Sequence, residues 1–274
     1  MKTYFKISLV PLAKEYPFKV PADVKRKAKD LCNKLSKYLI VEDLNMLYLP
    51  MESAEYSEVM AFVNEHCEYF YGTLGFYERK YSKHEMENAE YFTLKIANLV
   101  YSSNESNNFE YCCNEKCFAV GTNNNMRLEA RSMKNKDLGF TSDYRFVISE
   151  NLKTIIENSN ISNMIFIPAF HEKKDIIVAY QIEPIELMAN IAELNDWIIY
   201  RSCANSGKTI YDSNYVNQLA INKAIAMKMH DFNATSELFT ELGTHEYIIS
   251  KKLYLILKAC GIKSLKCEPI RIVE

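Results

Sequence analysis

The stretch FVISENLKTIIENSNISNMIFIPA, residues 146–169, decides the fold, because YIISKKLYLILKACGIKSLKCEPI, residues 247–270, matches it without a gap. The offset is 101 residues throughout, since 247 − 146 = 101. The matched pairs are Phe146–Tyr247, Val147–Ile248, Ile148–Ile249, Ser149–Ser250, Leu152–Leu253, Ile155–Ile256, Ile161–Ile262 and Pro168–Pro269. Each copy predicts a short apolar strand, a serine that caps a helix, an amphipathic helix and a second strand ending near a proline. We therefore expect a duplicated strand–helix–strand unit.

Composition limits the classes of function. The chain has 274 residues and a net charge of −2, from 33 basic and 35 acidic residues. This balance argues against general binding to nucleic acid or to anionic membranes. The N-terminal segment MKTYFKISLVPLAKEY lacks the long apolar core of a signal peptide, and a run of about 18 apolar residues is missing. We expect a cytoplasmic protein without a membrane span.

The N-terminal third predicts a small sheet with two helices. TYFKISLV at 3–10 alternates like a strand, and LNMLYL at 44–49 predicts a second one. Apolar residues recur at helical spacing in 24–38 and again in 53–67. These two segments are therefore expected to be amphipathic helices on the sheet.

The polar segment SSNESNN at 102–108 is typical of a linker. We place the domain boundary there, with an N-terminal α+β domain over 1–104 and a duplicated α+β domain over 105–274. The fold class is α+β, and the two repeat units are expected to share a mixed or largely antiparallel sheet.

Four shorter segments carry local predictions. The aromatic run 69–81 predicts a hairpin that turns near 72–75. Ser82 and Glu85 have the spacing of a capping box that opens a short helix. DWIIY at 196–200 predicts a strand, and the partly alternating segment 215–229 predicts one strand or a hairpin.

The cysteines suggest a metal site. In a reducing cytoplasm, the eight cysteines are expected to be buried thiols or metal ligands rather than disulfides. A cysteine-rich turn precedes each repeat copy: one contains Cys112, Cys113 and Cys117, and the other, Cys203-Ala-Asn-Ser206-Gly207, is a Cys-x-x-Cys-Gly knuckle with serine at its second position. The possible ligands are Cys113, Cys117 and Cys203, with Cys112 as a fourth. Either one structural zinc or no cofactor is compatible with this degenerate pattern.

The search for a catalytic site gives no motif. Ser-Gly-Lys-Thr at 206–209 lacks the earlier glycine of a phosphate-binding loop, so we reject nucleotide binding there. The five histidines form no metal-binding pair, and no nucleophile elbow is present. Asp231, Glu237 and His245 lie close in sequence, and the two carboxylates are expected to fix a loop through backbone hydrogen bonds.

The order of these features resembles the bacterial double Cys-x-x-Cys-Gly motif family and related immunity proteins of polymorphic toxin systems. The resemblance covers roughly residues 80–274. It rests on the two knuckles, the repeat units, DFNATSELF, IISKKLYLILK and the closing PIRI. The chain departs from the family pattern at Ser206 and in the longer spacing between Cys113 and Cys117, which affects metal binding more than the fold. The resemblance implies a cytoplasmic, non-enzymatic protein that binds and neutralises a co-encoded toxin.

Three functions follow as hypotheses. The first is an immunity protein whose partner is a cognate protein toxin, with binding residues that the sequence does not identify. The alternative is a structural zinc-ribbon-like module that binds nucleic acid or another protein, although the charge balance argues against nucleic acid. The third is an enzyme with a dispersed site, which requires a deep pocket with convergent polar groups.

Overall fold

The computed structural model describes residues 1–11, 20–41, 45–70, 75–101, 109–111, 113, 119–121, 126–141, 144–212, 217–239 and 243–274. The chain divides into two compact units, Met1–Glu85 and Met86–Glu274. Both contain helices and strands, which confirms the predicted α+β class. Among the helices described, none has the length and apolar character needed to cross a membrane.

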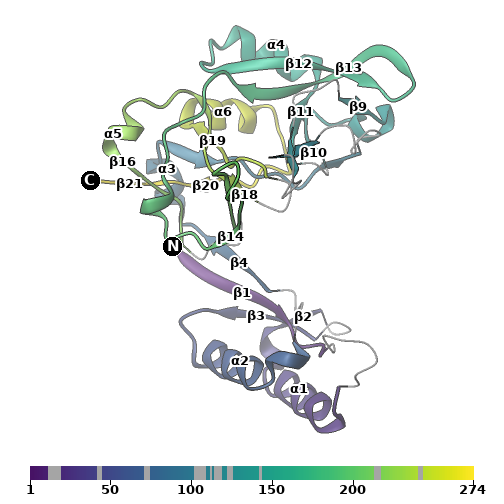
Figure 1. The fold of residues 1–274 in the computed structure, drawn as a ribbon, viewed down its shortest axis with the longest axis vertical. Helices are drawn as coiled ribbons and strands as arrows, with labels where there is room; N and C mark the ends of the chain where they lie inside the picture. Colours follow the sequence, from purple (N-terminus) through teal and green to yellow (C-terminus); the bar gives the residue numbers. More distant parts are fainter. Residues whose placement is uncertain are drawn as a thin grey trace. The chain divides into compact units, whose positions relative to one another are not determined.

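The N-terminal unit is one four-stranded sheet with two helices. Its elements are β1 (Lys2–Ser8), α1 (Ala22–Lys34), a 3-10 helix η1 (Ser36–Tyr38), β2 (Leu39–Val41), β3 (Met46–Pro50), α2 (Ala54–Glu65), a 3-10 helix η2 (Cys67–Tyr69) and β4 (Gly75–Lys80). The strand order is β2-β3-β1-β4, with antiparallel neighbours. Both helices cover one face of this sheet (Figure 1). This is the split βαβ, or ferredoxin-like, arrangement, and it confirms the small sheet with two helices.

Alternation along β1 builds the core of this unit. Phe5 and Ile7 point toward the helices and are buried, as is Leu9 just beyond the strand. The amide of Tyr56 donates to the Ser53 hydroxyl at 3.1 Å, which caps α2 at the residue where the helical pattern begins.

The C-terminal unit is built from many short elements. Helix α3 (Lys83–Asn88) spans the division between the units and begins at the predicted capping box, where Ser82 and Glu85 exchange hydrogen bonds. The elements that follow, as far as β13, are β5 (Tyr91–Thr93), β6 (Leu99–Val100), β7 (Phe109–Tyr111), β8 (Ala119–Gly121), β9 (Arg127–Leu128), η4 (Ala130–Met133), β10 (Leu138–Thr141), β11 (Phe146–Ile148), α4 (Glu150–Asn158), β12 (Met164–His171) and β13 (Lys174–Pro184).

The rest of the unit contains the second repeat copy. Its elements are η5 (Ala192–Leu194), β14 (Ile199–Ser202), β15 (Thr209–Tyr211), β16 (Ala220–Asn222), α5 (Lys223–Ala226), β17 (Phe232–Ala234), β18 (Leu238–Phe239), β19 (Tyr247–Ser250), α6 (Lys251–Ala259), β20 (Glu268–Pro269) and β21 (Arg271–Val273). The described strands form sheets with the orders β6-β10-β11-β13-β12-β9, β17-β19-β5-β20, β14-β15-β18, β16-β21 and β7-β8.

The structure confirms that the repeat is a strand–helix–strand unit. The first copy is β11-α4-β12 and the second is β19-α6-β20. The pattern of buried, half-buried and exposed residues over 152–160 is identical to that over 253–261. Asn160 and Gly261 are equivalent positions, since they are 101 residues apart. Both have the positive φ of a helix C-terminus, at 49° and 71°. The duplication is therefore preserved in the backbone as well as in the sequence.

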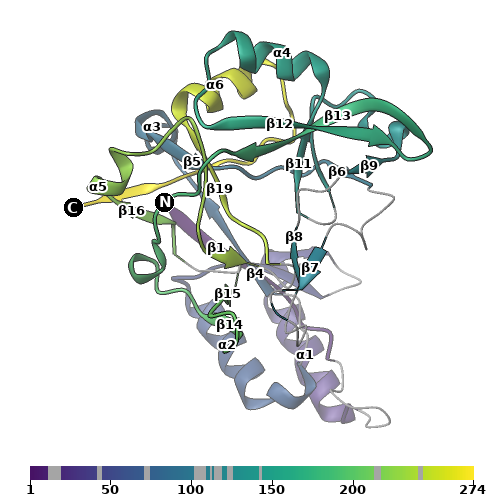
Figure 2. The same ribbon diagram turned by 45° about the horizontal axis from the view of Figure 1, so that its top comes forward.

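In each copy, a strand from outside the strand–helix–strand unit lies between the two strands of the unit. In the first copy β13 pairs antiparallel with β11 and β12, and Gln181 lies opposite both Val147 and Ile167. In the second copy β5 fills this place, and Thr93 lies opposite both Ile248 and Glu268. The registers match under the 101-residue offset. The middle strand follows the first copy in sequence, whereas the second copy takes its middle strand from far upstream (Figure 2).

The two copies lie in different sheets and share one core, whereas we expected one shared sheet. Leu152 and Ile156 of α4 are buried in the same cluster as Leu253 and Leu257 of α6. The rings of Phe146 and Tyr247, which are equivalent positions, are 5.1 Å apart and edge-to-face. Contacts between equivalent residues indicate that the copies face each other across an approximate twofold axis.

An aspartate anchors the helix cap in each copy. The Ser149 hydroxyl donates to the Asp137 carboxylate at 2.6 Å, and the Ser250 hydroxyl donates to Asp231 at 2.7 Å. The same serines accept from the amides of Leu152 and Leu253, at 3.1 and 3.2 Å. Each aspartate immediately precedes a strand that pairs with its copy, β10 or β17.

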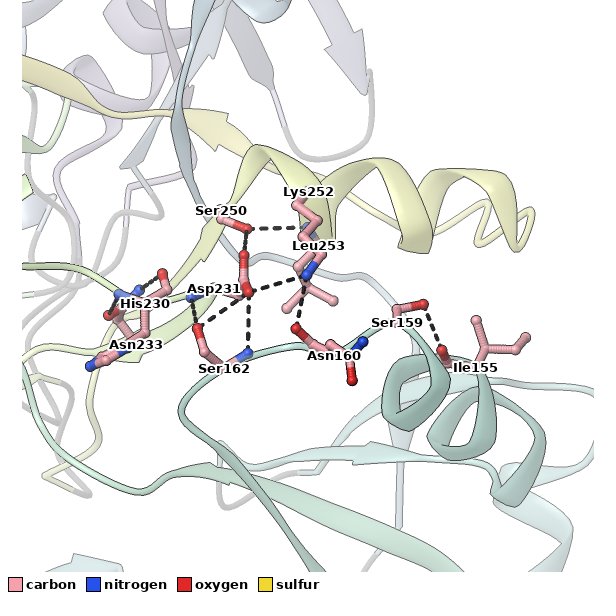
Figure 3. Close-up of polar contacts among 10 residues, drawn as sticks. All are labelled: Ile155, Ser159, Asn160, Ser162, His230, Asp231, Asn233, Ser250, Lys252 and Leu253. Carbon is pink, nitrogen blue, oxygen red and sulfur yellow. Dashed lines mark hydrogen bonds and ion pairs between the residues drawn. The ribbon is translucent and has the colours of Figure 1, made fainter. Parts of the chain in front are cut away.

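Asp231 also joins the two copies (Figure 3). Its second carboxylate oxygen accepts from the amide and the hydroxyl of Ser162, at 3.1 and 3.2 Å, in the loop after α4. Lys252 at the start of α6 lies 3.7 Å from this carboxylate and donates to the Asn160 carbonyl at 2.8 Å. Burial would raise the pKa of Asp231, but the bonds from Ser250 and Ser162 and the charge of Lys252 outweigh it and lower the pKa. The corresponding aspartate of the first copy, Asp137, acts on Cys260 at the end of α6. The pKa of the Cys260 thiol is raised by its own burial and also by the negative charge of Asp137.

A buried polar network lies close to the axis. Arg145 donates to Gln181 at 3.2 Å, Gln181 donates to Glu183 at 2.6 Å, and the Tyr247 hydroxyl donates to the same carboxylate at 3.0 Å. All four side chains are buried. Burial raises the pKa of Glu183, and the bonds from Gln181 and Tyr247 with the charge of Arg145 offset only part of this effect.

Three local predictions need correction. The division between the units falls before β5, not within 102–108, because β5 pairs with β19 and β20. In the run 69–81, Tyr69 ends η2 and β4 pairs with β1, so the described residues do not form the predicted hairpin. In 215–229, the Asn222 side chain caps α5, and a helix replaces the second half of the predicted strand or hairpin.

We predict that the two capping serines stabilise the fold to a similar extent. Ser149→Ala and Ser250→Ala should each lower the free energy of unfolding by about 0.5–2 kcal/mol, because each removes a cap bond. Ser159→Ala is the matched control, since its hydroxyl donates to the Ile155 carbonyl at the other end of α4 and caps no amide. Urea denaturation measures all three. Equal losses in the control and the cap variants would contradict the assignment.

Glu183 should make stability depend on pH. A carboxyl whose pKa is raised by folding stabilises the folded state at low pH, and this contribution is lost as pH rises above the unfolded value of about 4.3. From pH 7 to pH 5 the free energy of unfolding of the wild type should therefore increase relative to that of Glu183→Gln. Urea denaturation at several pH values measures the difference. The exposed Glu186→Gln should run parallel to the wild type, and parallel curves for Glu183→Gln would refute the prediction.

Candidate functional site

The predicted knuckle around Cys203 is the turn of a β-hairpin. Strands β14 and β15 pair antiparallel, with Ser202 opposite Thr209 (Figure 2). The Cys203 amide donates to the Lys208 carbonyl at 2.9 Å, and the Gly207 amide donates to the Cys203 carbonyl at 2.9 Å. Gly207 has a φ of 66°, which glycine adopts without strain. This turn fixes the direction of the Cys203 side chain.

The turn also places an amide on the sulfur. The Ser206 N–H donates to Cys203 Sγ at 3.4 Å. An N–H donor stabilises a thiolate more than a thiol, because hydrogen bonding to the charged form favours that form. Ser206 occupies the position where a complete knuckle has its second cysteine, and it has a hydroxyl there in place of a thiol.

The structure brings Cys203 together with Cys113. Their sulfur atoms are 3.5 Å apart, although the residues are 90 positions apart in sequence. This distance is far longer than a disulfide bond of about 2.05 Å. Two thiolates bound to one tetrahedral zinc at about 2.3 Å are separated by about 3.8 Å, so the pair has nearly the spacing of two zinc ligands. Cys203 is buried and packs with Ile210 and Leu238.

The remaining predicted ligands, Cys112 and Cys117, lie outside the described residues. Within the described part of the chain, no group of three or more histidine, cysteine or acidic side chains gathers in a way that would hold a metal ion. The described residues therefore fit two ligands of a zinc-thiolate site. A closed site with four protein ligands is structural rather than catalytic.

The Ser-Gly-Lys-Thr segment has no phosphate-binding geometry. Ser206 and Gly207 belong to the hairpin turn, and Thr209 begins strand β15. A phosphate-binding loop needs a helix N-terminus immediately after the lysine. The segment is therefore part of the knuckle.

The strand that leads into the knuckle exposes apolar side chains. Ile198, Ile199 and Tyr200 are 72%, 60% and 49% exposed, and Leu194 lies just before them at 36%. Strand β14 pairs with β15 in the described sheet β14-β15-β18. A cluster of large exposed apolar side chains marks a surface suited to contact with another protein.

Sequence reasoning found this strand but missed its exposure. Residues 196–200 were expected to form a strand, and β14 begins slightly later, at Ile199. Four adjacent apolar side chains, Trp197 to Tyr200, are typical of a strand buried on both faces. Only Trp197 is buried, against Phe239 at 4.6 Å between ring centroids. The sequence carries no signal for this exposure, because an unbroken apolar run predicts burial.

Asp231, Glu237 and His245 have structural roles. As expected, both carboxylates accept backbone hydrogen bonds, but from distant segments rather than from their own loop. Glu237 accepts from the amides of Ile191 and Ala192. His245 Nδ1 lies 3.2 Å from the Glu237 carbonyl, which can only accept, and burial lowers the pKa of this histidine. Asp231 therefore fixes the loop after α4 to the start of α6, whereas Glu237 and His245 fix the segments around β18.

No family model matches the chain, and no curated protein matches it. The site therefore has to be interpreted from its own geometry.

Proposed function

We propose that the protein is a non-enzymatic immunity protein that binds and neutralises a cognate protein toxin. The observation that supports this proposal is the exposed apolar run Ile198–Tyr200 at the start of β14. The resemblance of the repeat units and knuckles to immunity proteins supplies the class of partner.

The edge strand has the properties of a binding anchor. Burying one large apolar side chain contributes about 1.5–3 kcal/mol, so Ile198, Ile199 and Tyr200 together can supply a substantial part of a binding energy. Arg201 adds a charged rim next to the apolar run. The toxin is expected to present a complementary apolar groove.

The cysteine pair favours a second candidate function, a structural zinc-ribbon-like module. Zinc held by Cys113 and Cys203 would join the β14–β15 hairpin to a segment 90 residues earlier. Such a link would stiffen the hairpin that carries the exposed run, so the module would bind a protein. The net charge of −2 gives no electrostatic support for nucleic acid.

The immunity proposal makes a prediction about the toxin partner. The product of the adjacent upstream gene should co-purify with this chain, and co-expression should restore growth of cells that express the toxin. Ile199→Asp should weaken binding by about 30-fold or more, because it removes an anchor worth about 2 kcal/mol and adds a desolvation cost. Calorimetry and growth assays measure both effects.

The matched control is Leu255→Asp on α6, which changes an apolar side chain of similar exposure, 50%, away from β14. It should leave binding and rescue unchanged. Absence of both association and rescue would refute the immunity function. Full binding by Ile199→Asp would move the interface away from β14.

The zinc-ribbon candidate makes a prediction about the metal content of the purified protein. Protein purified without chelators should contain about one equivalent of zinc by elemental analysis, and Cys203→Ser should lose most of it. Cys67→Ser, which alters an exposed thiol in the N-terminal unit, should retain the metal. A wild-type protein without zinc, or equal zinc in both variants, would eliminate the zinc-ribbon candidate and leave the immunity proposal intact.

A further inference from the structure

A cavity of about 300 Å³ lies where the two repeat copies meet. Phe146 and Tyr247, the equivalent residues that touch near the approximate twofold axis, both line it. The cavity is partly open to solvent, so a ligand can enter it from the surface. An apolar cavity of about 150 Å³ is enough to bind benzene, so this one has room for two fused rings.

The lining is mainly aromatic. It contains the rings of Phe140, Tyr144, Phe146, Phe239 and Tyr247. Phe140 and Tyr144 are 5.4 Å apart at an interplanar angle of 78°, and Phe146 and Tyr247 are 5.1 Å apart at 86°. These edge-to-face pairs leave ring faces for a planar guest, which aromatic rings contact by stacking or by their edges. Leu94 and Ile96 complete the apolar part of the wall.

Tyr144 is held in an unusual backbone conformation at this cavity. Its φ is 62°, in the left-handed region that favours glycine and asparagine. Its amide donates to the Thr141 carbonyl at 2.9 Å in the turn between β10 and β11, and its side chain is 38% exposed. A bulky residue in this conformation is strained, and such strain persists where the side chain has a use. The exposed ring beside Phe140 forms one wall of the cavity.

The polar lining carries no net charge. Lys95 and Glu246 contribute opposite charges, and Lys95 lies 3.6 Å from Glu268. His245 donates to the Glu237 carbonyl, and burial lowers its pKa, so the ring is neutral at neutral pH. The lining thus supplies no net charge to offset the cost of desolvating a charged ligand.

We propose that this cavity binds an uncharged planar aromatic molecule of two fused rings. The site is separate from the β14 edge and does not depend on the toxin-binding proposal. The ligand class follows from the volume, the aromatic walls and the charge balance.

The test uses the full chain and 2-naphthol as the probe, with its saturated analogue decahydro-2-naphthol for comparison. Calorimetry should show one binding site for 2-naphthol and an affinity at least about tenfold weaker for the non-planar analogue. Tyr144→Gly should weaken 2-naphthol binding by about tenfold or more without harming the fold, because glycine adopts positive φ freely. Tyr101→Ala, which removes an exposed ring that does not line the cavity, should bind as the wild type does.

Three results would overturn the proposal. They are no binding of 2-naphthol at millimolar concentration, equal affinity of the planar and saturated probes, and unchanged affinity in Tyr144→Gly. Phe140→Leu provides a second variant if Tyr144→Gly fails to fold, and it should also weaken binding of the planar probe. Thermal denaturation of each variant establishes that loss of binding is not loss of structure.

Discussion

Neither repeat helix is long enough to be stable by itself, and this constraint determines the C-terminal unit. Helices α4 and α6 each have nine residues, whereas isolated helices below about 12–15 residues are marginal in water. Each therefore needs an apolar surface that its own short strands do not provide. The two copies meet this need by burying their helix stripes in one core, with Phe146 against Tyr247 at its centre. The capping serines, their aspartates and the bond from Asp231 to Ser162 then fix how the copies face each other.

The shared core also explains why the matched positions of the repeat serve in packing and why other segments supply the candidate binding surfaces. Matched positions of the two copies are apolar or capping residues, and they are used in packing. Three of the features proposed to be functional lie where the copies differ: the hairpin with Cys203, the exposed apolar run at β14 and the strained Tyr144. The cavity is also lined by the equivalent residues Phe146 and Tyr247. Duplication provided a stable scaffold, and the insertions between its elements carry the candidate binding surfaces.

The sequence was sufficient for the features that depend on local pattern. The gapless match predicts both strand–helix–strand units, and Ser149 and Ser250 mark the helix starts. The two cysteine-rich turns place Cys113 and Cys203 in one candidate ligand set, and their sulfur atoms are 3.5 Å apart. Features that depend on long-range pairing were missed. Asp137 and Asp231 precede their serines by 12 and 19 residues, so the gapless alignment could not pair them. The exposure of β14 depends on which strand lies beside it, and residue pattern does not record this.

The origin of β5 has a consequence for the order in which the chain folds during synthesis. Thr93 in β5 lies opposite Ile248 in β19 and Glu268 in β20. The hydrogen bond from the Thr93 hydroxyl to the Glu268 carbonyl spans 175 positions of the sequence. Strands β11 and β12 precede their partner β13 in the chain, but β5 must wait until residues 247–269 have been made. Contacts of such long range form slowly, because the intervening chain must first be ordered. During synthesis β5 therefore stays without these two partner strands for a long stretch of the chain, which makes it a natural target for chaperones.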